Sequence, residues 1–252
     1  MGRVRSGSRY ADNRTRRYAD DRDRRYAGGR DRRRAGAGMG AGARREGCVP
    51  AAFWALTAVL FFFSLSVVLV LNFRPLYYLD IPLLHLEKAS GLTAAGIREN
   101  YDVLIRYNQF WYTGELSFPD FAMSEGGRIH FREVRRIFVA LQYVCLVTGV
   151  LTAARLFRAR SKGLAFLKAA GWTLLLLPAA AAAAVAAGWE TFFVRFHELV
   201  FSNDYWLFDP ATDPVIEILP DTFFLQCAVL ILVLCAIAGI ACLRTGRTQK
   251  RK

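Results

Sequence analysis

Two of the three histidines in this chain are placed to share one site. The histidines are His85, His130 and His197. His130 lies seven residues before the apolar stretch that begins at Ile137, and His197 lies eight residues after the one that ends at Trp189. At 1.5 Å per helical residue, both imidazoles sit roughly 10 to 12 Å beyond the membrane hydrocarbon. Such a pair can take a proton from one atom and return it to another. The alternative is that both are structural residues of the interface, which is how we interpret the unmatched His85.

Carboxylates beside the histidines raise the alternative of a metal site. Glu133 follows His130 by three residues, and Glu198 follows His197 directly. Neither spacing matches the helical motif in which two histidines bind zinc, and Glu133 stands among three arginines. We therefore predict no metal and no cofactor.

A tetrahedral oxyanion needs hydrogen-bond donors held in a site with little water. The outward segments contain side chains that can serve as such donors: Asn100, Tyr101, Tyr107 and Asn203. The same residue types are equally common as turn residues and interfacial anchors, so the pattern leaves both roles open.

Four apolar stretches must position these residues. Each lacks charge over about the 20 residues that a helix needs to cross a bilayer. They are residues 51–73, 137–154, 169–189 and 222–243. Because backbone amides in lipid must be satisfied within their own segment, each stretch is predicted to be a transmembrane helix. The fold class is an all-α membrane protein with four transmembrane helices and extracytoplasmic interfacial helices and loops.

The distribution of charge predicts the orientation. Of 34 basic residues, 25 fall in residues 1–50, 155–168 and 244–252, which four crossings place on one side. By the positive-inside rule that side is the cytoplasm, so both termini are cytoplasmic and the loops 74–136 and 190–221 face outward. The net charge of +13 is thus explained by topology, and nucleic acid is not an expected partner.

The segments outside the spans differ in character. Residues 1–50 contain an arginine-rich repeat with almost no aliphatic side chains, and they are predicted to form a disordered cytoplasmic tail. A short basic tail, 244–252, follows the membrane domain 51–243. In the first outward loop, Thr93 can cap an amphipathic interfacial helix that carries apolar side chains as far as Trp111. Pro214 can start a further short helix in the second loop.

Several segments resemble one known family. They are Asn100–Tyr107, His130–Val134, Phe196–Glu198 with Phe201 and Asn203, and Trp206 through Leu219 to Phe224. In this order between four spans, over about residues 52–243, the chain resembles the bacterial integral membrane family that includes lipoprotein intramolecular transacylase. Glu133 and Arg135 depart from the Asp and Lys of the family pattern.

The resemblance implies an acyltransferase of the bacterial cytoplasmic membrane. Such an enzyme moves an acyl chain within a diacylglyceryl lipoprotein, from the glycerol sn-2 oxygen to the amine of the N-terminal cysteine, and yields a lyso-form lipoprotein. It implies His130 and His197 as catalytic residues, an extracytoplasmic active site, lipoproteins and the bilayer as partners, and Trp206 as a further candidate for substrate binding. The alternatives are a non-catalytic transporter or assembly factor and a metal-dependent membrane hydrolase.

Overall fold

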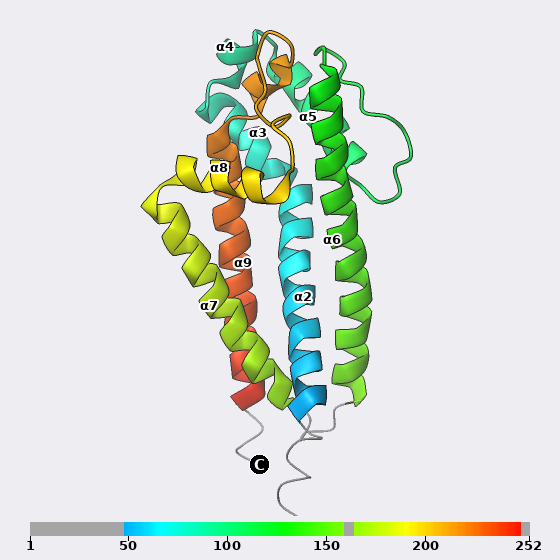
Figure 1. The fold of residues 1–252 in the computed structure, drawn as a ribbon, viewed down its shortest axis with the longest axis vertical. Coiled ribbons are helices and arrows are strands. Elements are labelled where there is room, and N and C mark those ends of the chain that lie inside the picture. Colours follow the sequence, from blue (N-terminus) through cyan, green and yellow to red (C-terminus); the bar gives the residue numbers. More distant parts are fainter. Residues whose placement is uncertain (1–47, 159–163, 248–252) are drawn as a thin grey trace, which may run out of the picture. The chain divides into compact units, whose positions relative to one another are not determined.

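Four long helices form the membrane part of the protein (Figure 1). The computed structural model describes residues 48–158 and 164–247. Four of its helices are long and apolar enough to cross a membrane, which confirms the predicted all-α, four-span fold. These helices are α2 (Cys48–Asn72), α6 (Glu125–Arg158), α7 (Ala165–Ala187) and α9 (Asp221–Arg247). The chain divides into two compact units, residues 1–51 and 52–252, and all three histidines belong to the second.

Helix α6 extends well beyond the predicted second span. It begins at Glu125, twelve residues before Ile137, and its 34 residues measure roughly 50 Å against about 30 Å of hydrocarbon. The extra turns carry Arg128, Arg132 and Glu133 among other charged residues, so the apolar part starts where the sequence placed it. His130 therefore lies on the helix but outside its membrane-spanning part.

Small residues bring α7 and α9 into close contact. A Cβ atom on Gly171 would lie 2.8 Å from the carbonyl oxygen of Gly239, so only glycine permits this backbone approach. Farther along the same helices, Leu174 and Cys235 are buried together with Ala58 of α2. The three helices thus share one apolar core inside the bundle.

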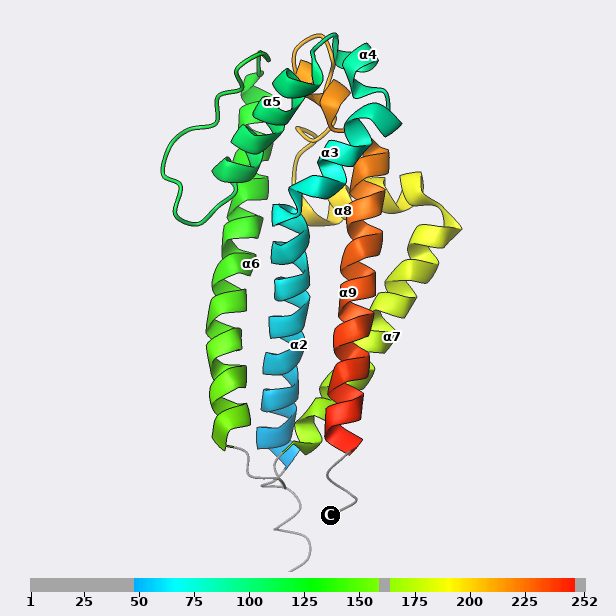
Figure 2. The same ribbon diagram turned by 180° about the vertical axis from the view of Figure 1, so that it is seen from behind.

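A cap of short helices covers one end of the bundle (Figure 2). The cap comprises α3 (Arg74–Leu83), α4 (Leu86–Ser90), α5 (Ala94–Tyr107) and the 3-10 helix η1 (Pro214–Ile218). The Thr93 hydroxyl accepts a hydrogen bond from the Gly96 amide at 3.3 Å, which confirms the predicted start of α5. Pro214 begins η1 as predicted. Trp111, however, lies beyond the end of α5 and is exposed, so the predicted helix was too long.

The apolar face of α5 packs against protein. Ile97, Tyr101 and Ile105 are buried in a core formed with residues of α3, η1 and the start of α9. Tyr101 stacks on Tyr77 with ring centres 3.7 Å apart, and the Tyr77 hydroxyl donates to the carbonyl of Ile218 at 2.8 Å. This packing covers the surface that the sequence pattern assigned to the membrane interface.

The segment between α7 and α9 begins with a helix, α8 (Trp189–Val200), that runs across the bundle (Figure 1). The chain is extended at Gly188, where α7 ends and α8 begins. Phe196 and Leu199 are exposed, and no residue of α8 is fully buried. This helix, rather than α5, presents an open apolar face of the kind that lies in a membrane interface.

The predicted tails fall largely outside the described residues. Of residues 1–50, only 48–50 are described, and they form the first turn of α2. The C-terminal tail predicted from 244 is helical as far as Arg247, where α9 ends. Residues 248–252 are not among those described.

Candidate active site

His130 sits on the charged extension of α6, against aromatic rings. Its side chain is 7% exposed. The centre of the imidazole ring lies 4.8 Å from the ring centre of Phe201 and 5.4 Å from that of Phe208. Its Nδ1 atom is buried and meets no hydrogen-bond partner within the described parts of the chain. Such an unpaired nitrogen is costly in a protein interior, so it marks a place where a ligand can supply the missing partner.

His197 reaches the same place from α8. Its Nδ1 lies 2.7 Å from the carbonyl oxygen of Phe193, one helical turn earlier. A carbonyl oxygen only accepts hydrogen bonds, so Nδ1 carries the hydrogen and, in the neutral ring, Nε2 is left with its lone pair. The imidazole is stacked on Trp206 at 4.8 Å and lies 4.2 Å from the ring of Phe193. Backbone and aromatic contacts thus hold the imidazole in one orientation, with Nε2 as a base.

The two imidazoles meet, as their matched depth in the sequence led us to expect. Their ring centres are 6.2 Å apart, with the planes inclined by 36°. At this separation a single reacting group can contact both rings. Helix α8 runs from the end of α7 across the bundle, and it brings His197 to His130, 67 positions earlier in the sequence (Figure 1).

The aromatic surroundings keep both histidines neutral. Burial, which strips the imidazolium of its hydration, and to a smaller extent repulsion by the neighbouring His197 together lower the pKa of His130 to about 4. Burial also lowers the pKa of His197, while its hydrogen bond to Phe193 acts in the opposite direction. At neutral pH one ring is therefore available as a base and the other as an uncharged hydrogen-bond donor.

Trp206 and Asn203 are the other candidates that lie near the pair. The Trp206 Nε1 atom is buried and, among the described residues, has no partner. Asn203 donates from Nδ2 to the Glu133 carboxylate, 3.1 and 3.3 Å from its two oxygens. Trp206 thus offers a free N–H beside His197, whereas the Asn203 amide joins the loop after α8 to the His130 helix.

The remaining three candidates belong to the cap. The Nδ2 group of Asn100 donates to Asp120 at 2.6 Å and to the Gly96 carbonyl at 2.8 Å, so both of its hydrogens are used. Tyr101 is buried against Tyr77. The ring of Tyr107 lies under the Arg135 guanidinium, 4.8 Å away. The structure therefore places these side chains in structural contacts, and it shows no contact of theirs with either histidine among the described residues.

The carboxylates considered for metal binding have other partners. Glu133 accepts from Asn203, and Glu198 pairs with Arg195 at 2.8 Å. Among the described residues, no group of three or more His, Cys, Asp and Glu side chains is arranged to hold a metal ion.

Sequence reasoning missed the phenylalanines that surround the pair. Phe193 and Phe201 lie four residues on either side of His197, and Phe208 follows in the next loop. Their helical spacing around a histidine was visible in the sequence. It could not be distinguished from the apolar stripe of an ordinary interfacial helix.

Known proteins resemble this chain in sequence and in structure. A family model described as lipoprotein intramolecular transacylase Lit matches residues 52–224. The structure of the membrane-integral lipoprotein intramolecular transacylase Lit from Bacillus cereus is 34% identical and superposes with a TM-score of 0.76, over 80% of this chain and 94% of that chain. No curated protein sequence matches.

Two further structures of the Bacillus cereus enzyme are similar to this chain. In one, a histidine is replaced by arginine; it is 33% identical, with a TM-score of 0.71 over 82% of this chain and 94% of that chain. In the other, a histidine is replaced by alanine; it is 32% identical, with a TM-score of 0.73 over 83% and 96%. The resemblance predicted from the sequence is confirmed: the chain belongs to the lipoprotein intramolecular transacylase Lit family and is a membrane-integral transacylase.

Proposed function

We propose that the chain moves an acyl chain within a diacylglyceryl lipoprotein, from the glycerol sn-2 oxygen to the amine of the N-terminal cysteine. The observation that carries the proposal is the meeting of two neutral imidazoles, 6.2 Å apart, in an aromatic site at the end of the membrane bundle. Ester and amine belong to one substrate molecule, so the enzyme needs to orient them, move a proton and stabilise charge. Family membership and the membrane location support this substrate class.

His197 is the proposed general base. An α-amine has a pKa near 7.7 to 8.0 and is mostly protonated at neutral pH, so it attacks an ester only after losing a proton. The Nε2 lone pair of His197 accepts that proton, because Nδ1 is held as donor by Phe193. The amine nitrogen then bonds to the ester carbonyl carbon, and the carbonyl oxygen becomes an oxyanion.

His130 and Trp206 are proposed to stabilise that oxyanion. A histidine whose pKa is about 4 remains neutral at physiological pH, so its N–H can donate a hydrogen bond without bringing a positive charge into the site. The Trp206 Nε1–H is a second unpaired donor. Donors that are already placed and dehydrated cost no reorganisation when charge develops.

Collapse of the intermediate completes the transfer. The bond between the carbonyl carbon and the glycerol oxygen breaks, and His197 returns its proton to that oxygen. The ammonium nitrogen loses two protons in becoming the amide: one ends on the glycerol oxygen and the other is released to solvent, and no water or second substrate is consumed. The aromatic rings packed on the pair favour this outcome over hydrolysis, because apolar side chains offer water no hydrogen bonds.

We further propose that the site faces outward and that both termini are cytoplasmic. The histidines lie at the cap end of the bundle, and 25 of the 34 basic residues lie in the segments assigned to the other side. This orientation follows from the charge bias and matches a lipoprotein substrate exposed on the outer leaflet.

A labelled substrate tests the reaction. The purified protein in nanodiscs is given a diacylglyceryl lipopeptide with a deuterated sn-2 acyl chain, and the N-terminal fragment is examined by mass spectrometry. We expect the label on the cysteine nitrogen, with the same yield in the presence of a chelator. Release of the label as free fatty acid would instead identify a hydrolase, and activity lost to chelation would identify a metal enzyme.

A further inference from the structure

A polar cavity lies on the face of the protein opposite to α8. It has a volume of about 890 Å³ and lies between the end of α2, the start of α3 and one side of α5. In Figure 1 α8 is in front, and in Figure 2 the view from behind brings α3 and α5 forward. The cavity is therefore separate from the histidine pair, although both lie at the same end of the bundle.

Three guanidiniums line this cavity. They belong to Arg74, Arg98 and Arg106, and the carboxylates among the lining residues are Glu99 and Asp102. Because three positive groups face two negative ones, the cavity has a positive balance. An anion is the ligand that this balance favours.

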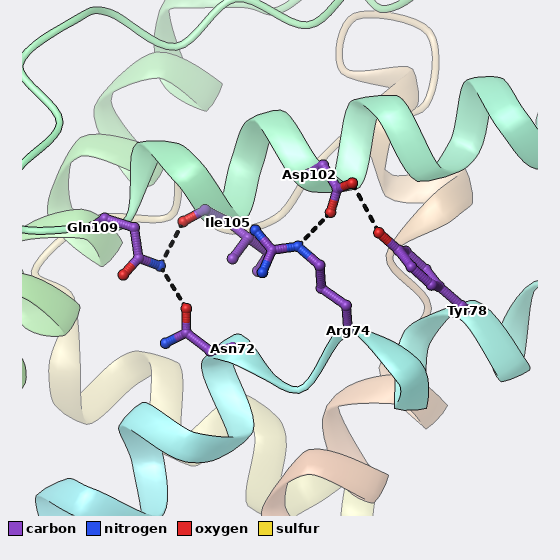
Figure 3. Close-up of polar contacts among 6 residues, drawn as sticks. All are labelled: Asn72, Arg74, Tyr78, Asp102, Ile105 and Gln109. Atoms are coloured by element: carbon purple, nitrogen blue, oxygen red, sulfur yellow. Dashed lines mark hydrogen bonds and ion pairs between the residues drawn. The ribbon is translucent and has the colours of Figure 1, made fainter.

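Asp102 fixes the position of Arg74, and both of its oxygens already accept a hydrogen bond (Figure 3). One of its oxygens accepts from Arg74 Nε at 2.6 Å, and the other accepts from the Tyr78 hydroxyl at 2.8 Å. Within the described residues the two terminal amino groups of Arg74 have no acceptor, and in Figure 3 they point away from Asp102 toward Gln109. A fixed guanidinium with free amino groups is suited to binding two oxygens of one phosphate.

The wall of the cavity formed by Gln109 and Asn72 is also held in place. Gln109 donates to Asn72 Oδ1 at 3.1 Å and to the carbonyl of Ile105 at 2.9 Å, which ties the end of α2 to α5 (Figure 3). The cavity is thus shaped before a ligand arrives, which lowers the entropic cost of binding.

Two exposed arginines complete the ring of donors. Arg98 and Arg106 lie eight residues apart on one face of α5, with Asp102 between them. Their guanidiniums rest on the rings of Tyr78, at 4.8 Å, and Tyr112, at 5.8 Å. An aromatic ring orients a guanidinium without supplying an acceptor, so the N–H groups stay available.

The cavity lies at the depth of lipid headgroups. Asn72 is the last residue of the first spanning helix, and Trp111 on the rim is 62% exposed, as is usual for tryptophan at a membrane interface. Leu69 and Phe73, on either side of Asn72 in the sequence, are also exposed. An acyl chain can lie on this apolar surface while its headgroup enters the cavity.

We propose that this cavity binds the phosphate of an anionic phospholipid in the surrounding leaflet. The phosphate oxygens accept hydrogen bonds from Arg74, Arg98 and Arg106, and the acyl chains lie against the end of α2. A net negative headgroup such as phosphatidylglycerol satisfies the positive balance, whereas the choline of phosphatidylcholine adds a positive charge. Free inorganic phosphate is the other source of the same chemistry.

Lipid retention tests the proposal. The full chain is placed in nanodiscs containing equal amounts of phosphatidylcholine and phosphatidylglycerol, and native mass spectrometry measures the ratio of the two lipids retained. We expect phosphatidylglycerol to predominate. The double variant R98Q/R106Q should lower that ratio roughly thirtyfold, since each arginine near the surface contributes about fivefold to anionic lipid binding.

Matched controls separate the cavity from general charge. The variant K88Q/R128Q removes two exposed cations of the same end of the protein that do not line the cavity, and it should retain the wild-type ratio. Replacing His197 by alanine should also leave the ratio unchanged, so the lipid preference is tested independently of the transacylase mechanism. Equal losses in both double variants, or no preference in the wild type, would overturn the proposal. Retention of inorganic phosphate in place of phosphatidylglycerol by the wild type, when both are offered, would identify free phosphate as the ligand and would also overturn the proposal.

Discussion

The cap and the histidine site differ in how they treat buried side-chain nitrogens. In the cap, the amide nitrogens of Asn100, Asn108 and Gln109 all donate to protein acceptors. At the histidine site, His130 Nδ1 and the indole nitrogens of Trp189 and Trp206 are buried without a partner among the described residues. The unpaired buried atoms of the cap, by contrast, are acceptor oxygens such as Asp80 Oδ2.

This difference separates structural from catalytic donors. A donor that is already satisfied holds the fold, because its removal leaves another buried group unpaired. A buried donor without a partner lowers the stability of the fold, and it remains free to bind a substrate oxyanion. Substitutions at the histidine site should therefore change mainly the rate of acyl transfer, and substitutions in the cap should change mainly the stability.

The largest effect should come from His197. Replacement by alanine removes the base, and acyl transfer should fall by roughly 10² to 10⁴, the usual contribution of general acid–base catalysis. Initial rates of N-acylated product from a diacyl lipopeptide measure the change. His85→Asn is the control, because His85 is exposed, outside the site, and has a left-handed backbone that asparagine tolerates. A rate in His197→Ala close to that of the control would contradict the assignment.

Trp206→Phe should have the next largest effect. It keeps an aromatic ring against His197 but removes the unpaired N–H, so kcat should fall by roughly 10² with little change in KM. Trp189→Phe removes another unpaired indole N–H whose ring reaches His197 only through Phe193, and it should be nearly neutral. If both variants behave alike, stacking on His197 does not single out the catalytic donor, and Trp206 loses its assigned role.

Asn100→Ala should show the opposite behaviour. It removes an amide that is fully buried and satisfied, so the free energy of unfolding should drop by roughly 1 to 2 kcal/mol. At temperatures where the variant remains folded, kcat should change less than threefold, as a rough bound for a residue away from the chemistry. Thermal unfolding in detergent and initial rates measure the two quantities. A loss of kcat without a loss of Tm would instead indicate that Asn100 acts on the substrate.

The smallest expected effect concerns pH. His197 must be neutral to act as the base, so activity is present above its pKa and is lost as pH falls through it. Burial lowers this pKa below the ordinary 6.5, and the acidic limb of kcat/KM should therefore lie below pH 6.5. Phe193→Ala removes a ring 4.2 Å from the imidazole but keeps the backbone carbonyl, so hydration should move that limb toward higher pH. Phe192→Ala, whose ring stacks on Trp189, should leave the limb in place.

Much of the membrane fold was predictable because its signals are local. Uncharged stretches of bilayer length identify spans, and Thr93 and Pro214 identify helix starts. The separate helix α8 was not predicted, although Gly188, where the backbone is extended between α7 and α8, is the residue type that commonly ends a helix. The end of α5 before Trp111 was missed because its apolar spacing continues past the last helical residue.

The site was only partly predictable from the sequence. The convergence of His130 and His197 was predicted from their matched spacing from the spans, but a constant helix rise holds only for His130 on α6. His197 reaches the site on a separate helix, α8, so for this residue the predicted position relied on a continuous helix that the structure does not have. Which donors remain free depends on contacts between distant segments. Asn100 and Trp206 were equivalent candidates in the sequence, yet Asp120 occupies the amide of one while the indole of the other has no partner among the described residues.

A double-mutant cycle on the two histidines tests the central claim most directly. Single-turnover rates of acyl transfer are measured for the wild type, His130→Ala, His197→Ala and the double variant, with folding checked by thermal unfolding. Residues that act on one transition state as a unit give strongly non-additive losses. We predict that both single variants are slowed and that the double variant is no more than a few-fold slower than the slower single one. Losses that multiply, or a single variant at the wild-type rate, would contradict a site built on the histidine pair.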